Sequence, residues 1–239
     1  MKRSDVPTRL TELAAEYALP ADAPAQLEAI LDAMVSEHAS ITTVRDPMDG
    51  VERHVEDALT GLRVPAVRTA GTIADLGAGA GFPGFALAAA LPETQVRLVE
   101  SVARKCAFLE RAAHTAGLRN VEIVSDRVEA WAAGHDAHDV VTARALAALP
   151  VLVEYAAPLL VEGGTLVAWK GRRDPQEEQA GDEAAALVGL SAHEVVALPP
   201  RRDGQEELER RLYLYVKVGP TPERFPRRVG VARKRPLAS

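Results

Sequence analysis

A short apolar run that ends in Asp75 is followed closely by four glycines, Gly77, Gly79, Gly81 and Gly84. A backbone without side chains at the end of a strand lets a ligand approach closely. The helix expected after such a loop offers N–H groups that have no partner inside the helix, together with a partial positive charge. Residues 72–84 therefore predict a strand, a glycine-rich loop and a helix that form a cofactor site.

The glycine spacing fits two kinds of cofactor. Gly79 to Gly84 matches the dinucleotide pattern G-x-G-x-x-G, and Glu100 lies about 20 residues further on, as that pattern requires. In the other register, Asp75 to Gly81 resembles the first motif of class I methyltransferases that use S-adenosylmethionine (SAM). Asp75 favours SAM, because a carboxylate there would repel the pyrophosphate of NAD but can accept hydrogen bonds from the methionine end of SAM. An NAD-dependent oxidoreductase is the alternative.

Strand-like and helix-like segments alternate along the rest of the core. Helices are expected at 82–91, 102–116, 128–133, 147–157 and 176–188, and strands at 95–99, 121–124, 139–142 and 164–169. This order predicts an α/β fold of the class I SAM-dependent methyltransferase (Rossmann-like) type, with a mostly parallel sheet. The strands expected at 191–198 and 211–218, joined by the turn-like segment 199–204, predict an antiparallel hairpin at one edge.

The sequence predicts three parts. Residues 1–62 form an N-terminal helical cap, with a turn at 45–50 and a helix at 51–62; residues 63–218 form the SAM-binding core, and residues 219–239 a basic C-terminal arm. Two amphipathic stripes support the cap, one of Leu10, Leu13, Ala14 and Tyr17, the other of Leu27, Ile30, Leu31, Met34 and Val35. Prolines and glycines in the arm favour an extended conformation over a helix.

Charge is distributed unevenly along the chain. Of its 28 basic and 34 acidic residues, six basic and one acidic residue lie from Gly219 onward, so residues 1–218 are left with 22 basic and 33 acidic residues. A basic tail on an acidic body is typical of contact with a nucleic-acid backbone. Aromatic residues make up only 4% of the chain, which argues against an aromatic base-stacking platform.

The sequence predicts no disulfide, no metal site and no membrane or secreted location. Cys106 is the single cysteine, which excludes an intramolecular disulfide and a multi-cysteine zinc site. His135 and His138 have H-x-x-H spacing but no further ligands nearby, so no metal is predicted. The sequence has no long apolar run and no signal-peptide pattern, so we expect a cytoplasmic protein without a membrane partner.

The chain resembles one family, the RsmG (also called GidB) small-subunit rRNA guanine-N7 methyltransferases of bacteria. The resemblance rests on Asp75–Gly84, Ser101–Leu109, Arg127–Glu129, Ala143–Ala145, Lys170-Gly171 and Phe225–Pro236. Upstream, Arg45-Asp-Pro47 and Arg53-His54-x-x-Asp57 also match. Residues 36–43 depart from the Trp-Asn and Asn-Leu-Thr that the family usually has, which puts in doubt any contacts made by those asparagines.

The resemblance implies a role for particular residues. Glu100 would hold the ribose hydroxyls of SAM, and Arg144 would face its reacting end, where it is the catalytic candidate. The full set of cofactor contacts expected is Asp75, Gly77, Gly79, Phe82, Glu100, Val128, Glu129 and Arg144. Contacts with 16S rRNA or the small ribosomal subunit are expected from Lys170, Arg227, Arg228, Arg233, Lys234 and Arg235.

The residues present are compatible with guanine N7 as the methyl acceptor. Guanine N7 has a free lone pair, so it needs no general base. A C5-pyrimidine mechanism would require a nucleophilic cysteine, whereas Cys106 lies in the middle of a predicted helix. Exocyclic-amine methyltransferases usually have Asn/Asp-Pro-Pro-aromatic after the fourth strand, where this chain has Thr142-Ala-Arg-Ala145. A non-catalytic RNA-binding assembly factor on the same fold remains an alternative.

Overall fold

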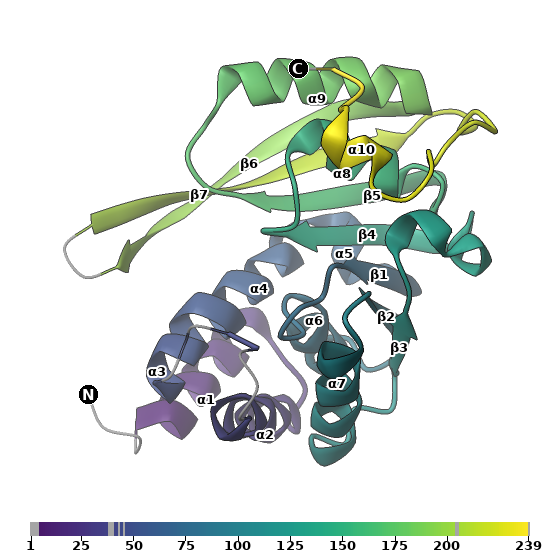
Figure 1. Cartoon of the computed structure of the whole chain (residues 1–239). Coiled ribbons are helices and arrows are strands. Elements are labelled where there is room, and N and C mark those ends of the chain that lie inside the picture. The colour runs from purple at the N-terminus through teal and green to yellow at the C-terminus, as the bar shows by residue number, and fades with distance from the viewer. Residues whose placement is uncertain (1–4, 38–40, 43, 45, 204–205, 239) are drawn as a thin grey trace. The chain divides into compact units, whose positions relative to one another are not determined.

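The computed structural model describes residues 5–37, 41–42, 44, 46–203 and 206–238 (Figure 1). Contacts within the chain divide it into two compact units, Met1–Asp126 and Arg127–Ser239. These two units do not coincide with the cap, core and arm predicted from the sequence. The bounds of those three parts stay a prediction.

The first unit begins with a group of helices, as the amphipathic stripes predict. They are α1 (Val6–Tyr17), α2 (Ala23–Ser36), α3 (Pro47–Gly50), a π-helix (Val51–Glu56), α4 (Asp57–Leu59), a 3-10 helix (Thr60–Arg63) and α5 (Pro65–Arg68). The apolar faces of α1 and α2 are buried except at Val35, which is exposed, and α2 packs on the later helices α6 (Gly84–Ala90) and α7 (Ala103–Thr115).

The turn predicted at 45–50 is wrong for residues 47–50, which are helical. The side chain of Asp46 accepts hydrogen bonds from the backbone N–H groups of Met48 (2.8 Å) and Asp49 (3.4 Å). These bonds cap the helix, and Pro47 suits its first position because no N–H is needed there. Arg45 lies outside the described residues, as do residues 38–40 and 43 of the divergent segment 36–43.

Three parallel strands of the first unit lie in the order β3-β2-β1. Their bounds are Thr72–Leu76 for β1, Gln95–Glu100 for β2 and Val121–Ser125 for β3. Leu76 pairs with Val99, so the carboxyl ends of β1 and β2 meet at one edge of the sheet. Since Asp75 and Glu100 stand at these ends, the parallel pairing brings the glycine loop and Glu100 together. Helix α6 begins at Gly84 rather than at residue 82.

The second unit has four strands in the order β4-β5-β7-β6. Their bounds are His138–Arg144 for β4, Leu160–Lys170 for β5, Leu190–Asp203 for β6 and Glu206–Lys217 for β7. β4 and β5 are parallel, and β7 is antiparallel to both β5 and β6. The predicted antiparallel edge hairpin is therefore confirmed.

The helices of this unit are α8 (Leu149–Ala156), α9 (Pro175–Val188) and α10 (Val231–Lys234), with short 3-10 turns at Val128–Ala130 and Ala132–Gly134 in place of the helix predicted at 128–133. Figure 1 shows α9 lying across β6 and β7. Hydrogen bonds from Tyr213 to Glu178 and from Tyr215 to Asp182 attach β7 to this helix.

Two further predictions in this unit are corrected. The turn expected at 199–204 is largely strand, because β6 continues through Pro199 with a register shift between Leu198 and Arg201. An edge strand tolerates proline at such an irregularity, since the ladder of backbone hydrogen bonds is already interrupted there. Gly204 lies outside the described residues. The arm is not wholly extended, because α10 forms in it and packs on α8.

Candidate functional site

The glycine loop of the first unit is built around a buried carboxylate. Asp75 is 1% exposed, and its Oδ2 accepts a hydrogen bond from the backbone N–H of Gly84 at 3.0 Å. A Cβ on Gly84 would lie 2.1 Å from Leu98 Cδ2, so only glycine permits this approach of α6 to β2. Asp75 and Gly84 therefore set the position of the loop between them.

The middle of the loop leaves space for a ligand. Gly77 and Gly79 have φ angles of 64° and 60°, in the left-handed region that favours glycine. A Cβ on Gly79 would meet only the carbonyl oxygen of Gly77, at 3.6 Å. Side chains thus leave this stretch of backbone open, as a cofactor cradle requires.

Glu100 closes the same edge of the sheet. Its side chain is 7% exposed, and its Oε2 accepts a hydrogen bond from the N–H of Gly79 at 3.1 Å. Its Oε1 accepts from the N–H groups of Ser101 (2.8 Å) and Val102 (2.9 Å), while Lys105 Nζ lies 3.9 Å from Oε2. The carboxylate is thus fixed beside the glycine loop, where the sequence expects the ribose contact.

Phe82, the remaining cofactor candidate of this unit, packs on a residue from the preceding helical segment. Its ring stacks on His54 with a centroid distance of 5.3 Å and an angle of 14° between the planes, and it meets the edge of Phe85. His54 also lies 3.2 Å from the hydroxyl of Thr42. The histidine before the core therefore supports the wall of the glycine loop.

In the second unit, Val128 is buried, and the carboxylate of Glu129 accepts two hydrogen bonds. Glu129 Oε1 accepts hydrogen bonds from the hydroxyl of Tyr155 (3.0 Å) and from the backbone N–H of Gly230 (2.8 Å). Burial and the charge of Glu129 raise the pKa of Tyr155 to about 12. A residue expected beside the adenine of the cofactor is thus bonded to the C-terminal arm.

Arg144 and Lys170 stand at the ends of neighbouring parallel strands, β4 and β5. Arg144 is half-buried and pairs in register with Trp169. Lys170 forms an ion pair with Glu177 at 2.5 Å and donates to the carbonyl of Ala147 at 3.3 Å. The ammonium of Lys170 is therefore engaged within the protein, and its contact with RNA stays a prediction.

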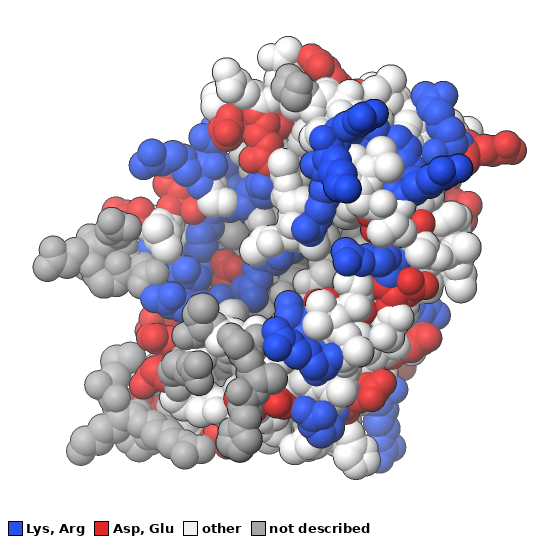
Figure 2. Space-filling view, viewed as in Figure 1, with Lys and Arg blue, Asp and Glu red and all other residues white. Residues whose placement is uncertain are grey.

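The RNA contacts expected in the arm fall into two groups. Arg227, which is partly exposed, forms an ion pair with the buried Glu154, whereas Arg228, Arg233, Lys234 and Arg235 are exposed. Figure 2 shows Lys and Arg side chains gathered where Figure 1 has α10 and the segment before it. Sequence reasoning missed Glu154 and Tyr155, because nothing in the local pattern of α8 links them to residues of the arm.

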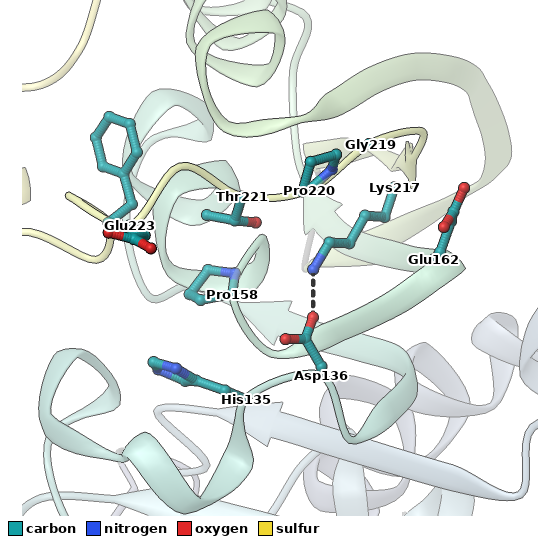
Figure 3. A pocket seen from close by; sticks show the side chains of 10 residues that line it. His135, Asp136, Pro158, Glu162, Lys217, Gly219, Pro220, Thr221 and Glu223 are labelled. Carbon is teal, nitrogen blue, oxygen red and sulfur yellow. Dashed lines mark hydrogen bonds and ion pairs between the residues drawn. The ribbon is translucent and has the colours of Figure 1, made fainter.

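A cavity of about 590 Å³ lies elsewhere in the second unit (Figure 3). Lys217 points across it to Asp136, with 2.7 Å between Nζ and Oδ1, and also donates to the carbonyl of Leu160. His135 lines this cavity, whereas His138 is buried against the ring of Trp131. In the part of the chain that the structure describes, no group of three potential ligands could hold a metal ion.

No helix among the described residues is long and apolar enough to cross a membrane.

Comparisons with known proteins agree on one family. Residues 26–205 match the family described as rRNA small subunit methyltransferase G, GidB. The ribosomal RNA small subunit methyltransferase G of Rubrobacter xylanophilus is 42% identical over 83% of this chain and 77% of its own. The protein of the same name from Chloroflexus aggregans is 39% identical over 89% of this chain and 90% of its own.

Solved structures show the same fold over about two thirds of the chain. A predicted O-methyltransferase from Agrobacterium tumefaciens superposes with a TM-score of 0.51 at 25% identity, covering 64% of this chain and 79% of its own. A mutant 16S rRNA (adenine(1408)-N(1))-methyltransferase from Catenulisporales acidiphilia superposes with a TM-score of 0.53 at 19% identity, covering 65% and 89%.

The family match decides between the two cofactors that the glycine spacing allows, and it sets aside the NAD-dependent oxidoreductase. The chain belongs to the rRNA small subunit methyltransferase G family, and it is a SAM-dependent methyltransferase with a class I fold.

Proposed function

We propose that the protein transfers the methyl group of SAM to N7 of a guanine in 16S rRNA of the small ribosomal subunit. The observation that carries the proposal is the buried Asp75 at the tip of β1, with Glu100 beside an open glycine loop, in a chain of this family. An rRNA substrate implies a protein that works in the cytoplasm, where ribosomes are assembled.

The residues of the first unit fit the proposed cofactor. The open backbone at Gly79 permits close contact, and the two carboxylates, Asp75 and Glu100, can accept hydrogen bonds from the amino group and the ribose hydroxyls of SAM. Phe82, held against His54, would form an apolar wall. The other expected contacts, Val128, Glu129 and Arg144, lie in the second unit and stay predictions.

Bound SAM would supply an electrophilic methyl group on a positively charged sulfur. The protein then needs to align the acceptor nitrogen with that methyl group and to stabilise the shifting charge. Since guanine N7 carries a free lone pair in the major groove, no side chain has to remove a proton. Arg144 is the residue that we assign to positioning the acceptor at the reacting end.

The exposed basic residues of the arm are the proposed contacts with RNA phosphates. They are Arg228, Arg233, Lys234 and Arg235, which lie on and around α10. Arg227 has its guanidinium on Glu154, and we assign it an anchoring role in place of the phosphate contact expected from the sequence. Lys170, paired with Glu177, is a weaker candidate.

Transfer of labelled methyl groups tests the function. Purified protein, labelled SAM and either naked 16S rRNA or small ribosomal subunits are incubated, and the digested nucleosides are separated beside a 7-methylguanosine standard. We expect label that elutes with the standard. Label in another nucleoside would overturn the N7 assignment, and binding to RNA without any transfer would favour the non-catalytic assembly factor.

A further inference from the structure

The C-terminal arm is anchored to α8 through a buried carboxylate. Glu154 is 0% exposed, and it accepts hydrogen bonds from the backbone N–H of Arg227 at 3.1 Å and from its guanidinium, with Nη2 at 2.6 Å. A buried carboxylate is costly without a cation, so this ion pair and its hydrogen bonds favour the docked arm. The carboxylate also raises the pKa of Arg227, which keeps the guanidinium charged.

From this anchor the arm reaches two segments that carry proposed site residues. Gly230 donates its N–H to Glu129 at 2.8 Å, and Arg233 Nη2 donates to the carbonyl of Leu146 at 2.9 Å. Leu146 stands two residues after Arg144 in the chain. The arm therefore holds both the segment expected beside the adenine and the loop that follows the catalytic candidate.

Tyr155 joins these contacts into one cluster. Its hydroxyl donates to the same Glu129 oxygen that receives the Gly230 N–H. Arg233 lies close enough to lower the pKa of Tyr155, against the larger raising effects of burial and of Glu129. Glu129 is thus oriented by one donor from α8 and one from the arm.

We propose that Arg227 and Arg233 are positioning residues that hold Glu129 and the loop after Arg144 in their binding geometry, so that SAM affinity depends on the docked arm. The proposal rests on the proposed function for the roles of Glu129 and Arg144. The arm would then support SAM binding in addition to contacting RNA. RNA held by Arg228, Lys234 and Arg235 would restrain the same segment, so RNA and SAM would each strengthen binding of the other.

Calorimetric titration of SAM into the full-length protein without RNA tests the inference, because a residue that only contacts RNA cannot change this affinity. We expect Arg227→Ala and Arg233→Ala to weaken SAM binding about tenfold, within the usual range of coupling between sites. Arg224→Ala, the matched control at an exposed arginine of the same arm that has no assigned role, should leave the dissociation constant unchanged. Wild-type affinity in both positioning variants would overturn the proposal.

If Arg227→Ala does not fold, the Arg233→Ala variant still tests the proposal. Arg233 is exposed, and its substitution removes a surface contact, so Arg233→Ala should melt close to the wild type. Arg233→Lys retains a donor for the Leu146 carbonyl and should recover most of the affinity; failure of this rescue in a folded variant would contradict the positioning role. Absence of SAM binding in the wild type would instead overturn the proposed function itself.

Discussion

The backbone N–H of Gly84 donates to the buried carboxylate of Asp75 at 3.0 Å, and this bond joins the end of β1 to the start of α6. Asp75 is 1% exposed, so hydrogen bonds from protein groups such as this one take the place of water around its carboxyl group. The same contact leaves no room for a side chain at position 84. Asp75 and Gly84 therefore both stabilise the connection between β1 and α6 and shape the proposed cofactor site.

Gly84→Ala is expected to destabilise the protein. The added Cβ would lie 2.1 Å from Leu98 Cδ2 and 2.9 Å from Asp75 Oδ2, and Leu98 is fully buried and cannot move aside freely. Overpacking of this kind costs about 1–3 kcal/mol. Urea denaturation measures the loss, and Gly219→Ala serves as the control, since its Cβ would meet nothing within 4 Å. Equal midpoints for the two variants would contradict this packing argument.

Asp75→Asn is expected to weaken SAM binding while the protein stays folded. The amide oxygen can still accept the N–H of Gly84, but the charge that strengthens bonds to the cofactor is lost. Hydrogen bonds to charged groups contribute about 1.5–3 kcal/mol, so the dissociation constant should rise roughly tenfold or more. Calorimetry of SAM binding checks this, with the exposed Asp22→Asn as the control. An unchanged SAM affinity in Asp75→Asn would remove Asp75 from the cofactor site.

Arg144→Ala is expected to slow methyl transfer. Loss of a group that aligns the reacting atoms can slow the chemical step by about 100-fold. Single-turnover transfer of labelled methyl groups at saturating SAM and RNA measures the chemical step. Arg144→Lys, which retains an N–H donor that can position the acceptor, should be less impaired. Turnover at the wild-type rate in Arg144→Ala would exclude the residue from the site.

Arg228→Ala is expected to lower the salt dependence of RNA binding. Each phosphate contact that is lost reduces the slope of log K against log salt by about 0.7–0.9. Fluorescence anisotropy of labelled 16S rRNA fragments at several KCl concentrations provides the slope. Arg119→Ala removes an equally exposed charge from the first unit and should leave the slope unchanged. If both variants have the wild-type slope, Arg228 does not contact phosphate.

Tyr155→Phe is expected to lower stability at neutral pH, and this loss should shrink in alkaline solution. Unfolded tyrosine has a pKa of about 10, whereas burial and Glu129 raise the pKa of folded Tyr155 to about 12. The unfolded state therefore loses its proton first, and the stabilisation that Tyr155 provides below pH 10 disappears as the pH rises towards 12.

Urea midpoints of wild type and Tyr155→Phe between pH 8 and 12 test this dependence. The difference between the two proteins should shrink as the pH rises, since the wild type alone loses the contribution of Tyr155. A difference in urea midpoint that stays constant across this range would show that folding does not raise the pKa of Tyr155. Tyr213 and Tyr215, whose pKa values are also raised by burial, are present in both proteins and cancel in the comparison.

The sequence by itself determined the features that depend on neighbours along the chain. The glycine loop after Asp75, the alternation of strands and helices and the antiparallel edge hairpin could all be predicted, because periodicity and turn residues act locally. The register that pairs Leu76 with Val99, and so brings Glu100 to the loop, came from the structure. Local capping was missed at Asp46, where a helix begins inside an expected turn.

Only the tertiary structure decided which residues the functional candidates would contact. Glu154 and Arg227 are 73 positions apart, and Glu129 and Gly230 are 101 apart, so no local pattern could pair them. Their pairing depends on burial, since a carboxylate enclosed by α8 and the arm must find a donor or a cation. The basic tail could be read from composition, but its division into an anchoring Arg227 and exposed neighbours required the folded chain.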